Sequence, residues 1–157
     1  MHPTRKLIRL IIALCLLSTL FVGCSKNDSA PQSQPVQMGN PLMEMASLEE
    51  MEDKLGYSVP VLEKAVEAYI VVNMGDQPSI GRICYADGSV FNMQRGTGDV
   101  SGIYGGESVG EEDVNGIAVS YFTFEDESYA LWESDGYTYS LTGGENLNEE
   151  VAFLLNS

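Results

Sequence analysis

The segment from Gly116 to Thr142 constrains the fold most, because it has the pattern of three strands joined by short polar turns. Apolar and polar residues alternate over 137–142, which is typical of a strand with one buried and one solvent-facing side. The linkers at 125–128 and 134–136 are too short for anything but antiparallel hairpins. A three-stranded meander with one apolar face needs a second layer over that face. We therefore expect the rest of the chain to supply such a layer.

Two helices are indicated on either side of the central strands. Ser47 and Glu50 form a capping box, apolar residues follow at helical spacing, and Gly56 provides a left-handed stop. Near the C-terminus, Asn146 is placed to cap a second amphipathic helix, with Glu149 three residues further on.

Further strands are predicted at about 69–74, 80–85 and 89–95, the last two joined by an Ala-Asp-Gly hairpin turn. The stretch 60–68 is ambiguous between an irregular and a short helical approach. The glycine-rich segment 96–110 is expected to be a loop with a short extended piece near 102–104. Together these elements predict an α+β domain with an antiparallel sheet of about six strands packed against two amphipathic helices.

The N-terminus has the features of an export signal. A basic head precedes an apolar run at 10–22 that is shorter than the roughly 20 residues of a membrane span. Cys24 follows a sequence that resembles a bacterial lipobox, which predicts a lipoprotein signal peptide over 1–23. The polar stretch 24–40 is then a lipidated cysteine followed by a flexible tether, and 41–157 is a single domain. An ordinary secretory signal or an uncleaved anchor is the alternative. The expected location is the outer face of the cell membrane.

Charge is the plainest bulk property. From Cys24 onward, 23 acidic residues stand against five basic ones, a net charge near −18. Such a chain is unsuited to nucleic acid or anionic headgroups, which bind through lysine and arginine. The negative charge is most simply explained by solubility. A more specific alternative is that it binds a basic partner or divalent cations. Cys84 would be the only thiol left after processing, so no internal disulfide is expected.

The mature sequence offers little catalytic chemistry. Its only histidine is His2, inside the signal peptide, so imidazole-based catalysis and typical zinc sites are excluded. The acidic runs at 111–113 and 125–127 lack calcium-loop spacing. We therefore expect no catalytic residue, no metal and no cofactor.

The run from Arg95 to Gly106 is the least ordinary local feature. Arg95 ends a strand and could pair with Asp99 to fix a loop rich in glycine. Together with Ser101 and Tyr104, these residues form either a recognition loop or a structural crossover between two halves of the sheet. We prefer the structural interpretation.

Several short motifs in this chain resemble those of a family. They are Asn40-Pro41-Leu42, Lys54-Leu55-Gly56-Tyr57, Ile83-Cys84-Tyr85, the run Arg95 to Tyr104, Ala130-Leu131-Trp132 and Tyr137-Thr138-Tyr139-Ser140. The set resembles an uncharacterised domain on secreted lipoproteins of Gram-positive, Clostridia-type bacteria. A related domain occurs on the outer side of anti-sigma-like membrane proteins. The resemblance covers nearly all of 41–157 and implies a curved antiparallel sheet, with no known activity.

These observations favour a surface-tethered, non-enzymatic binding or sensing domain. Its partners would be the membrane, through the lipid on Cys24, and an envelope protein or cell-wall component. The alternative is a carrier that holds an apolar ligand or lipid between sheet and helices. The aromatic residues that motivate it are Tyr121, Phe122, Phe124, Trp132, Tyr137 and Tyr139. A hydrolase using acidic residues is a third and weaker hypothesis.

Overall fold

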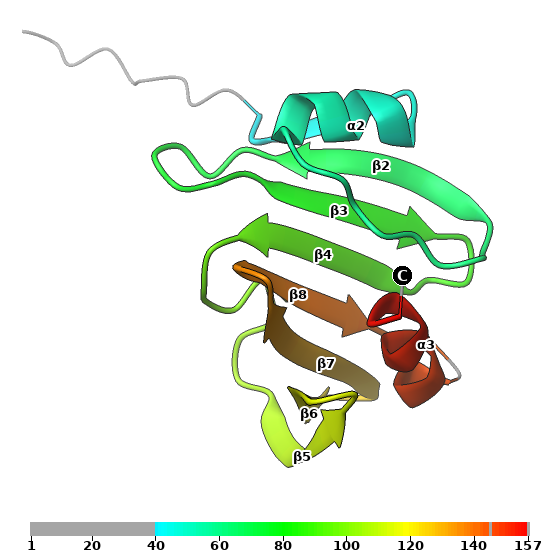
Figure 1. Cartoon of the computed structure of the whole chain (residues 1–157). Helices are drawn as coiled ribbons and strands as arrows, with labels where there is room; N and C mark the ends of the chain where they lie inside the picture. The colour runs from blue at the N-terminus through cyan, green and yellow to red at the C-terminus, as the bar shows by residue number, and fades with distance from the viewer. Residues whose placement is uncertain (1–39, 145, 157) are drawn as a thin grey trace, which may run out of the picture. The chain divides into compact units, whose positions relative to one another are not determined.

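The computed structural model describes residues 40–144 and 146–156. The predicted signal peptide, Cys24 and nearly all of the tether lie outside these residues. The described part is α+β, with one open antiparallel sheet and two helices (Figure 1). Its eight strands are β1 (Leu42–Met45), β2 (Val66–Val72), β3 (Ile80–Tyr85), β4 (Val90–Arg95), β5 (Glu107–Val114), β6 (Ile117–Phe124), β7 (Glu127–Ser134) and β8 (Tyr137–Thr142).

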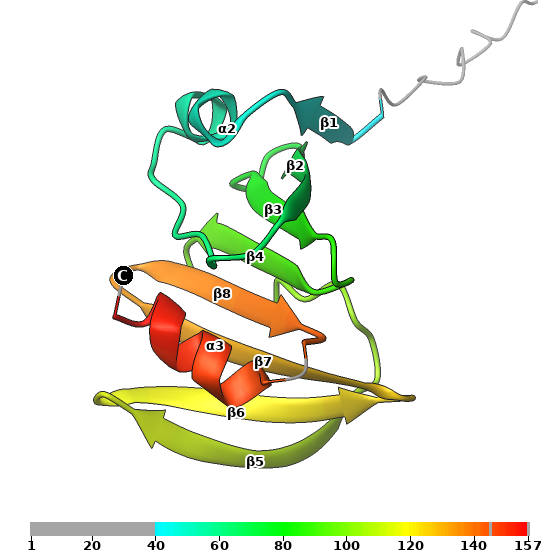
Figure 2. The same ribbon diagram turned by 90° about the vertical axis from the view of Figure 1, so that its right-hand side faces the viewer.

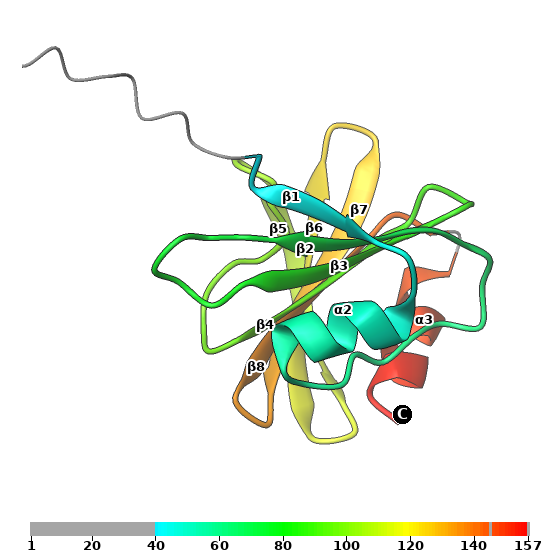
Figure 3. The same cartoon turned by 90° about the horizontal axis from the view of Figure 1, so that it is seen from above.

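The strands are ordered β1-β2-β3-β4-β8-β7-β6-β5 across the sheet. The chain therefore builds one half of the sheet up to β4, crosses over, and builds the other half inward from β5 to β8 (Figure 1). β4 and β8 meet at the centre, where Arg95 pairs with Tyr137 and Phe91 pairs with Leu141. The strands turn progressively along the sheet, so that β2 and β3 cross β6 and β7 at a large angle (Figure 3).

The predicted number of about six strands is too low. The two missed strands, β1 and β5, are the edges of the sheet. β5 has the sequence ESVGEEDV and is exposed along nearly its whole length, so it shows no alternating pattern. Charged residues are common on edge strands, and the backbone pairing with β6 determines the structure there.

The boundaries near the edges also differ from the prediction. No helix forms at 60–65, which is an irregular segment, and β2 begins at Val66 rather than near Tyr69. No strand forms at 102–104, the site predicted for a short extended piece.

The two helices are α2 (Leu48–Leu55) and α3 (Leu147–Leu154). Ser47 caps α2 as predicted, because the backbone N–H of Glu50 donates to Ser47 Oγ at 3.2 Å. The Glu50 carboxylate reaches back one residue further than expected and accepts from the backbone N–H of Ala46 at 2.7 Å. Gly56 ends the helix at a φ of 76°, which favours glycine. Asn146 precedes α3 but makes no side-chain capping hydrogen bond, contrary to expectation.

One hydrophobic core lies between the helices and the sheet. Both helices lie on the same side of the sheet (Figure 2), α2 against β2 and β3 and α3 against β7 and β8. At the centre, the rings of Trp132 and Tyr139 stack with centroids 5.4 Å apart and planes within 6° of each other. The fully buried core side chains include Met51, Ile83, Phe91, Val119, Leu141 and Val151.

The opposite face of the sheet is not solvent-facing as the alternation in β8 suggested. Thr138 and Ser140 are only 2 % and 0 % exposed. The crossover segment 96–106 covers them, and Thr138 Oγ1 donates to the carbonyl oxygen of Gly96 at 2.7 Å. A Cβ at Gly106 would come within 2.1 Å of the hydroxyl oxygen of Tyr129, so a larger residue there would force the tyrosine ring or the crossover to shift. The crossover segment therefore forms a second layer, packed on the polar face of the sheet.

Candidate functional site

The crossover loop is fixed by its own short side chains. Asp99 Oδ1 accepts hydrogen bonds from the backbone N–H and the hydroxyl of Ser101, at 2.8 and 2.6 Å. Ser101 Oγ accepts in turn from the backbone N–H of Ile103 at 3.1 Å. Ser101 is 8 % exposed and neighbouring Val100 only 2 %. This part of the loop is a pinned structural turn.

Arg95 does not pair with Asp99. Its guanidinium carbon lies 5.8 Å from the ring centroids of both Tyr57 and Tyr137. Arg95 and Tyr137 are directly paired on β4 and β8, so their side chains share the face that carries the helices. Asp99 belongs to the loop that crosses the other face, so the two charges are separated by the sheet.

Tyr104 lies apart from the other three candidate residues. Its side chain is 91 % exposed. It lines a shallow hollow of about 550 Å³ together with Phe124 and the acidic turn at 125–127. The four residues singled out in the sequence thus lie on three different surfaces and do not form one site.

A groove of about 600 Å³, here called the aromatic groove, lies on the helix side of the sheet. It lies between the segment 58–60, the strands β7 and β8, and the C-terminal end of α3. Its lining residues are Ser58, Val59, Pro60, Met93, Ile117, Trp132, Ser134, Asp135, Tyr137, Tyr139, Leu154 and Leu155.

Tyr57, which lies outside the lining, supports the aromatic rings of this groove. Tyr57 packs against Tyr137 with centroids 5.1 Å apart. Its hydroxyl lies 3.2 Å from the carbonyl oxygens of both Ser79 and Met93 and can donate to either. Burial raises the pKa of Tyr57 to about 12, and burial also raises the pKa of Tyr139. Both phenols are therefore neutral near pH 7, and the rings act as flat, weakly polar surfaces.

A second groove, of about 740 Å³, lies between the β5–β6 hairpin and the start of α3. Its lining includes the carboxylates Glu111, Glu112 and Glu149 beside the ring of Tyr121. In the described part of the chain, no three His, Cys, Asp or Glu side chains are arranged to hold a metal ion.

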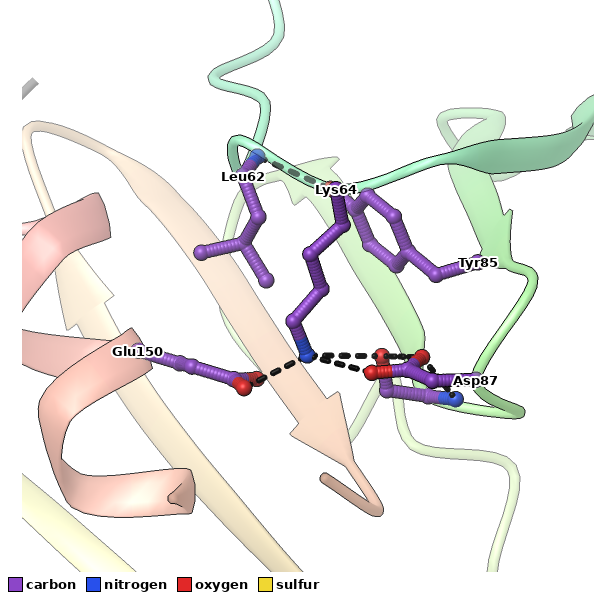
Figure 4. Close-up of polar contacts among 6 residues, drawn as sticks. Leu62, Lys64, Tyr85, Asp87 and Glu150 are labelled. Atoms are coloured by element: carbon purple, nitrogen blue, oxygen red, sulfur yellow. Dashed lines mark hydrogen bonds and ion pairs between the residues drawn. The ribbon is translucent and has the colours of Figure 1, made fainter. Parts of the chain in front are cut away.

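Lys64 connects three elements that are distant in sequence. Its Nζ lies 2.7 Å from Asp87 Oδ2, in the β3–β4 turn, and 2.5 Å from Glu150 Oε1, on α3 (Figure 4). The adjacent backbone is fixed as well, because the N–H of Leu62 donates to the hydroxyl of Tyr85 at 3.0 Å. The Lys64 side chain is 23 % exposed and that of Glu150 is 14 % exposed. This cluster holds α3, one wall of the aromatic groove, against the sheet.

The Lys64 cluster predicts a pH-dependent contribution to stability. Burial opposes the charge of Lys64, but hydrogen bonds to Asp87 and Glu150 outweigh it and raise the pKa of Lys64. Hydrogen bonds from Lys64 and Ser89 hold the pKa of Asp87 well below its usual range. The Asp87 contribution is therefore present above its ordinary pKa near 4 and is lost as the pH falls further. The Lys64 contribution is present below about pH 10.4 and is lost as the pH rises through its raised pKa.

We accordingly expect Lys64→Met to lower the free energy of unfolding by about 1–3 kcal/mol near pH 7. This range lies between the stabilisation that exposed ion pairs provide and the loss caused by breaking a fully buried pair. The difference from the unchanged protein should shrink below about pH 4. Urea unfolding at several pH values measures it. Lys54→Met, at an exposed lysine in the last turn of α2, is the control and should change stability by less than about 0.5 kcal/mol. Equal losses of stability in Lys64→Met and Lys54→Met would contradict the stabilising role assigned to the Lys64 cluster.

Cys84 is a half-buried free thiol on β3. Burial raises its pKa, so the reactive thiolate is disfavoured.

Among the described residues, neither helix is long and apolar enough to serve as a membrane span.

The sequence reasoning identified some residues of the aromatic groove and missed others. Trp132, Tyr137 and Tyr139 were noted as strand aromatics, and the structure brings them together. The support that Tyr57 gives to Tyr137 from outside the lining was not predicted, because it depends on how the chain leaves α2. Segment 58–60 was overlooked for the same reason.

Residues 90–155 match the family model described as Domain of unknown function (DUF4367). No curated protein and no solved structure matches the chain. The match supports the resemblance to a domain of unknown function but carries no information on secretion, lipid attachment or source. It spans β4 to β8 and the whole of α3, ends at Leu155, and so includes most of the aromatic groove. The segment 58–60, which forms one rim, lies outside it.

Proposed function

We propose that the chain is a non-enzymatic binding module, held at the outer face of the cell membrane by a lipid on Cys24, and that it binds its partner in the aromatic groove. The observation that carries this proposal is the groove itself. Its volume of about 600 Å³ is within the range of small-ligand sites, roughly 300–1,000 Å³. It combines flat rings with a few polar groups, which is the usual composition of such sites.

The groups around the groove suit binding better than catalysis. Asp135 and Ser134 are the polar side chains at the β7–β8 turn, and their contact with each other is long, at 3.4 Å. The hydroxyls of Tyr57 and Tyr139 are neutral at physiological pH, and the only histidine of the sequence is His2. General acid–base catalysis needs a group with a pKa near the working pH. The residues that line the groove include no histidine and no cysteine.

The partner is proposed to be an envelope protein or a cell-wall component. The supporting features are the predicted lipid anchor and the polar tether, which would present the domain to the extracytoplasmic space. The high negative charge makes nucleic acid an unsuitable partner.

The second candidate function is transport of an apolar ligand. It is favoured by the position of the groove between the sheet and α3, and by the side chains of Val59, Leu154 and Leu155 along its wall. If this function is correct, a hydrophobic probe should change the fluorescence of Trp132 and should compete with the natural partner.

The binding proposal predicts position-specific photo-crosslinking on whole cells. A photoreactive residue in place of Ser58, which is exposed at the rim of the groove, should give one discrete covalent product. The matched position is Val109, which is 65 % exposed and lines the other groove, and it should give little product. The full-length chain is used throughout, and products are detected by electrophoresis and mass spectrometry.

The same chain with Cys24→Ser tests the anchor. It should leave the membrane fraction, and the Ser58 product should decrease because the domain is no longer held near its partner. Equal yields from positions 58 and 109 would argue against the groove. Complete retention of the Cys24→Ser chain in the membrane fraction would rule out the lipid anchor.

A further inference from the structure

Arg95 has an unusual environment for a cation in so acidic a chain. The described residues contain four basic side chains. Lys64 is paired with two carboxylates, and the Nε–H of Arg82 donates to Asn92 Oδ1 at 2.7 Å. Lys54 lies at the C-terminal end of α2, where the helix dipole favours a positive charge. Arg95 is exposed, and among the described residues its guanidinium contacts the rings of Tyr57 and Tyr137.

These two rings fix the position of the guanidinium without neutralising its charge. Each centroid is 5.8 Å from the guanidinium carbon, and Tyr57 is itself held by its hydroxyl near the carbonyl oxygens of Ser79 and Met93. Contact with ring faces leaves the N–H donors of an arginine fork without acceptors. The group is thus positioned in advance for an anion.

The surroundings indicate which anion would fit. The chain has a formal net charge of −15, so its long-range field disfavours a doubly charged phosphate more than a singly charged carboxylate. A guanidinium fork matches the two oxygens of a carboxylate.

The aromatic groove begins beside Arg95. Met93 and Arg95 point to the same face of β4, and Tyr137 and Tyr139 point to that face of β8 in register with them. Met93, Tyr137 and Tyr139 all line the groove. A ligand with its charged end at Arg95 would therefore lay its body along the tyrosine rings. Asp135 also lines the groove and would repel a carboxylate there, which sets the orientation of the ligand.

We propose that the ligand of the aromatic groove is an organic carboxylate with a ring-shaped or apolar body, and that Arg95 binds its carboxylate. This inference rests on the proposed binding function and adds the chemical class of the ligand. Arg95 is then the residue that determines specificity, while Tyr137 and Tyr139 provide the surface for the body.

The test compares N-acetylphenylalanine with its neutral amide as probes of the purified full-length chain. The two probes share the ring and differ in the charge at one end. We expect the acid to bind about ten times more tightly than the amide, as for a charge-assisted contact. NMR titration of the tyrosine ring signals gives both dissociation constants. In Arg95→Gln the preference for the acid should disappear, and Arg95→Lys should retain part of it.

Two further variants sharpen the result. Asp135→Asn should strengthen binding of the acid by about two- to threefold without changing binding of the amide, because it removes a repulsive charge. Lys54→Gln, which removes the same charge from an exposed residue outside the lining of the groove, should leave the preference unchanged. Equal affinity for acid and amide in the unchanged protein would overturn the inference while leaving the groove as a binding site. Binding of neither probe would overturn it as well, and the crosslinking at position 58 would then decide the broader proposal separately.

Discussion

Phe91→Ala is expected to lower the free energy of unfolding by about 3–5 kcal/mol. Phe91 is fully buried on β4, at the centre of the sheet. Its ring lies 6.3 Å from that of Trp132 and 6.2 Å from that of Tyr139, measured between centroids. Removing it would leave a cavity that the surrounding strands cannot close, because β4 is paired on both sides, with β3 and β8. A domain of this size is typically stable by only about 5–15 kcal/mol, so a large fraction would be lost.

Urea unfolding of the full-length chain, followed by circular dichroism and by Trp132 fluorescence, measures this effect. Tyr104→Ala is the control, since it removes an aromatic ring that is 91 % exposed and should change stability by less than about 0.5 kcal/mol. Similar midpoints for the two variants would mean that the core between the helices and the sheet does not hold the domain together.

The central strands could be predicted from sequence because each carries its own local signal. The meander β6–β7–β8 and the β3–β4 hairpin combine alternating residues with strong turn sequences, and the structure confirms them. Edge strands carry no such signal. β5 is acidic and exposed, and only its pairing with β6 makes it a strand.

The aromatic groove could be predicted only in part. The sequence shows aromatic residues in β7 and β8, but a strand aromatic is equally expected in a packed core. Trp132 is in fact almost completely buried, whereas Tyr137 and Tyr139 remain half-buried beside open space. That difference depends on where segment 58–60 and the end of α3 are placed. Such placement follows from long-range packing and has no local sequence signal.

The expected pair of Arg95 and Asp99 illustrates the same limitation. They are four positions apart in the sequence, and in a loop such neighbours often meet. Here the chain passes around the end of the sheet between them, so one lies on each face. A sequence shows the distance along the chain, but the register of β4 against β8 decides the face.

The polar face of the central strands leads to the second large effect, an expected loss of about 2–3 kcal/mol in Asn92→Ala. Asn92 is fully buried on β4 between Arg82 on β3 and Ser140 on β8, its direct partners in the sheet. Its Oδ1 accepts from Arg82 Nε–H at 2.7 Å, and its Nδ2 donates to Ser140 Oγ at 3.0 Å. Alanine would leave both neighbours without this partner beneath the crossover segment 96–106, where water has little access. Unsatisfied buried groups cost more than an ordinary hydrogen bond contributes.

A double-mutant cycle distinguishes the loss of the hydrogen bond between Asn92 and Ser140 from a simple loss of packing. Ser140→Ala alone should cost about 1 kcal/mol, because Asn92 keeps its contact with Arg82. If the two side chains act as a unit, the double variant should cost less than the sum of the single changes, by about 0.5–1 kcal/mol or more. Asn148→Ala, at an exposed position of α3, controls for the chemical change and should have little effect. Strictly additive effects in the cycle would show that Asn92 and Ser140 are not coupled. The buried polar face would then be held by the crossover segment alone, through contacts such as Thr138 with Gly96.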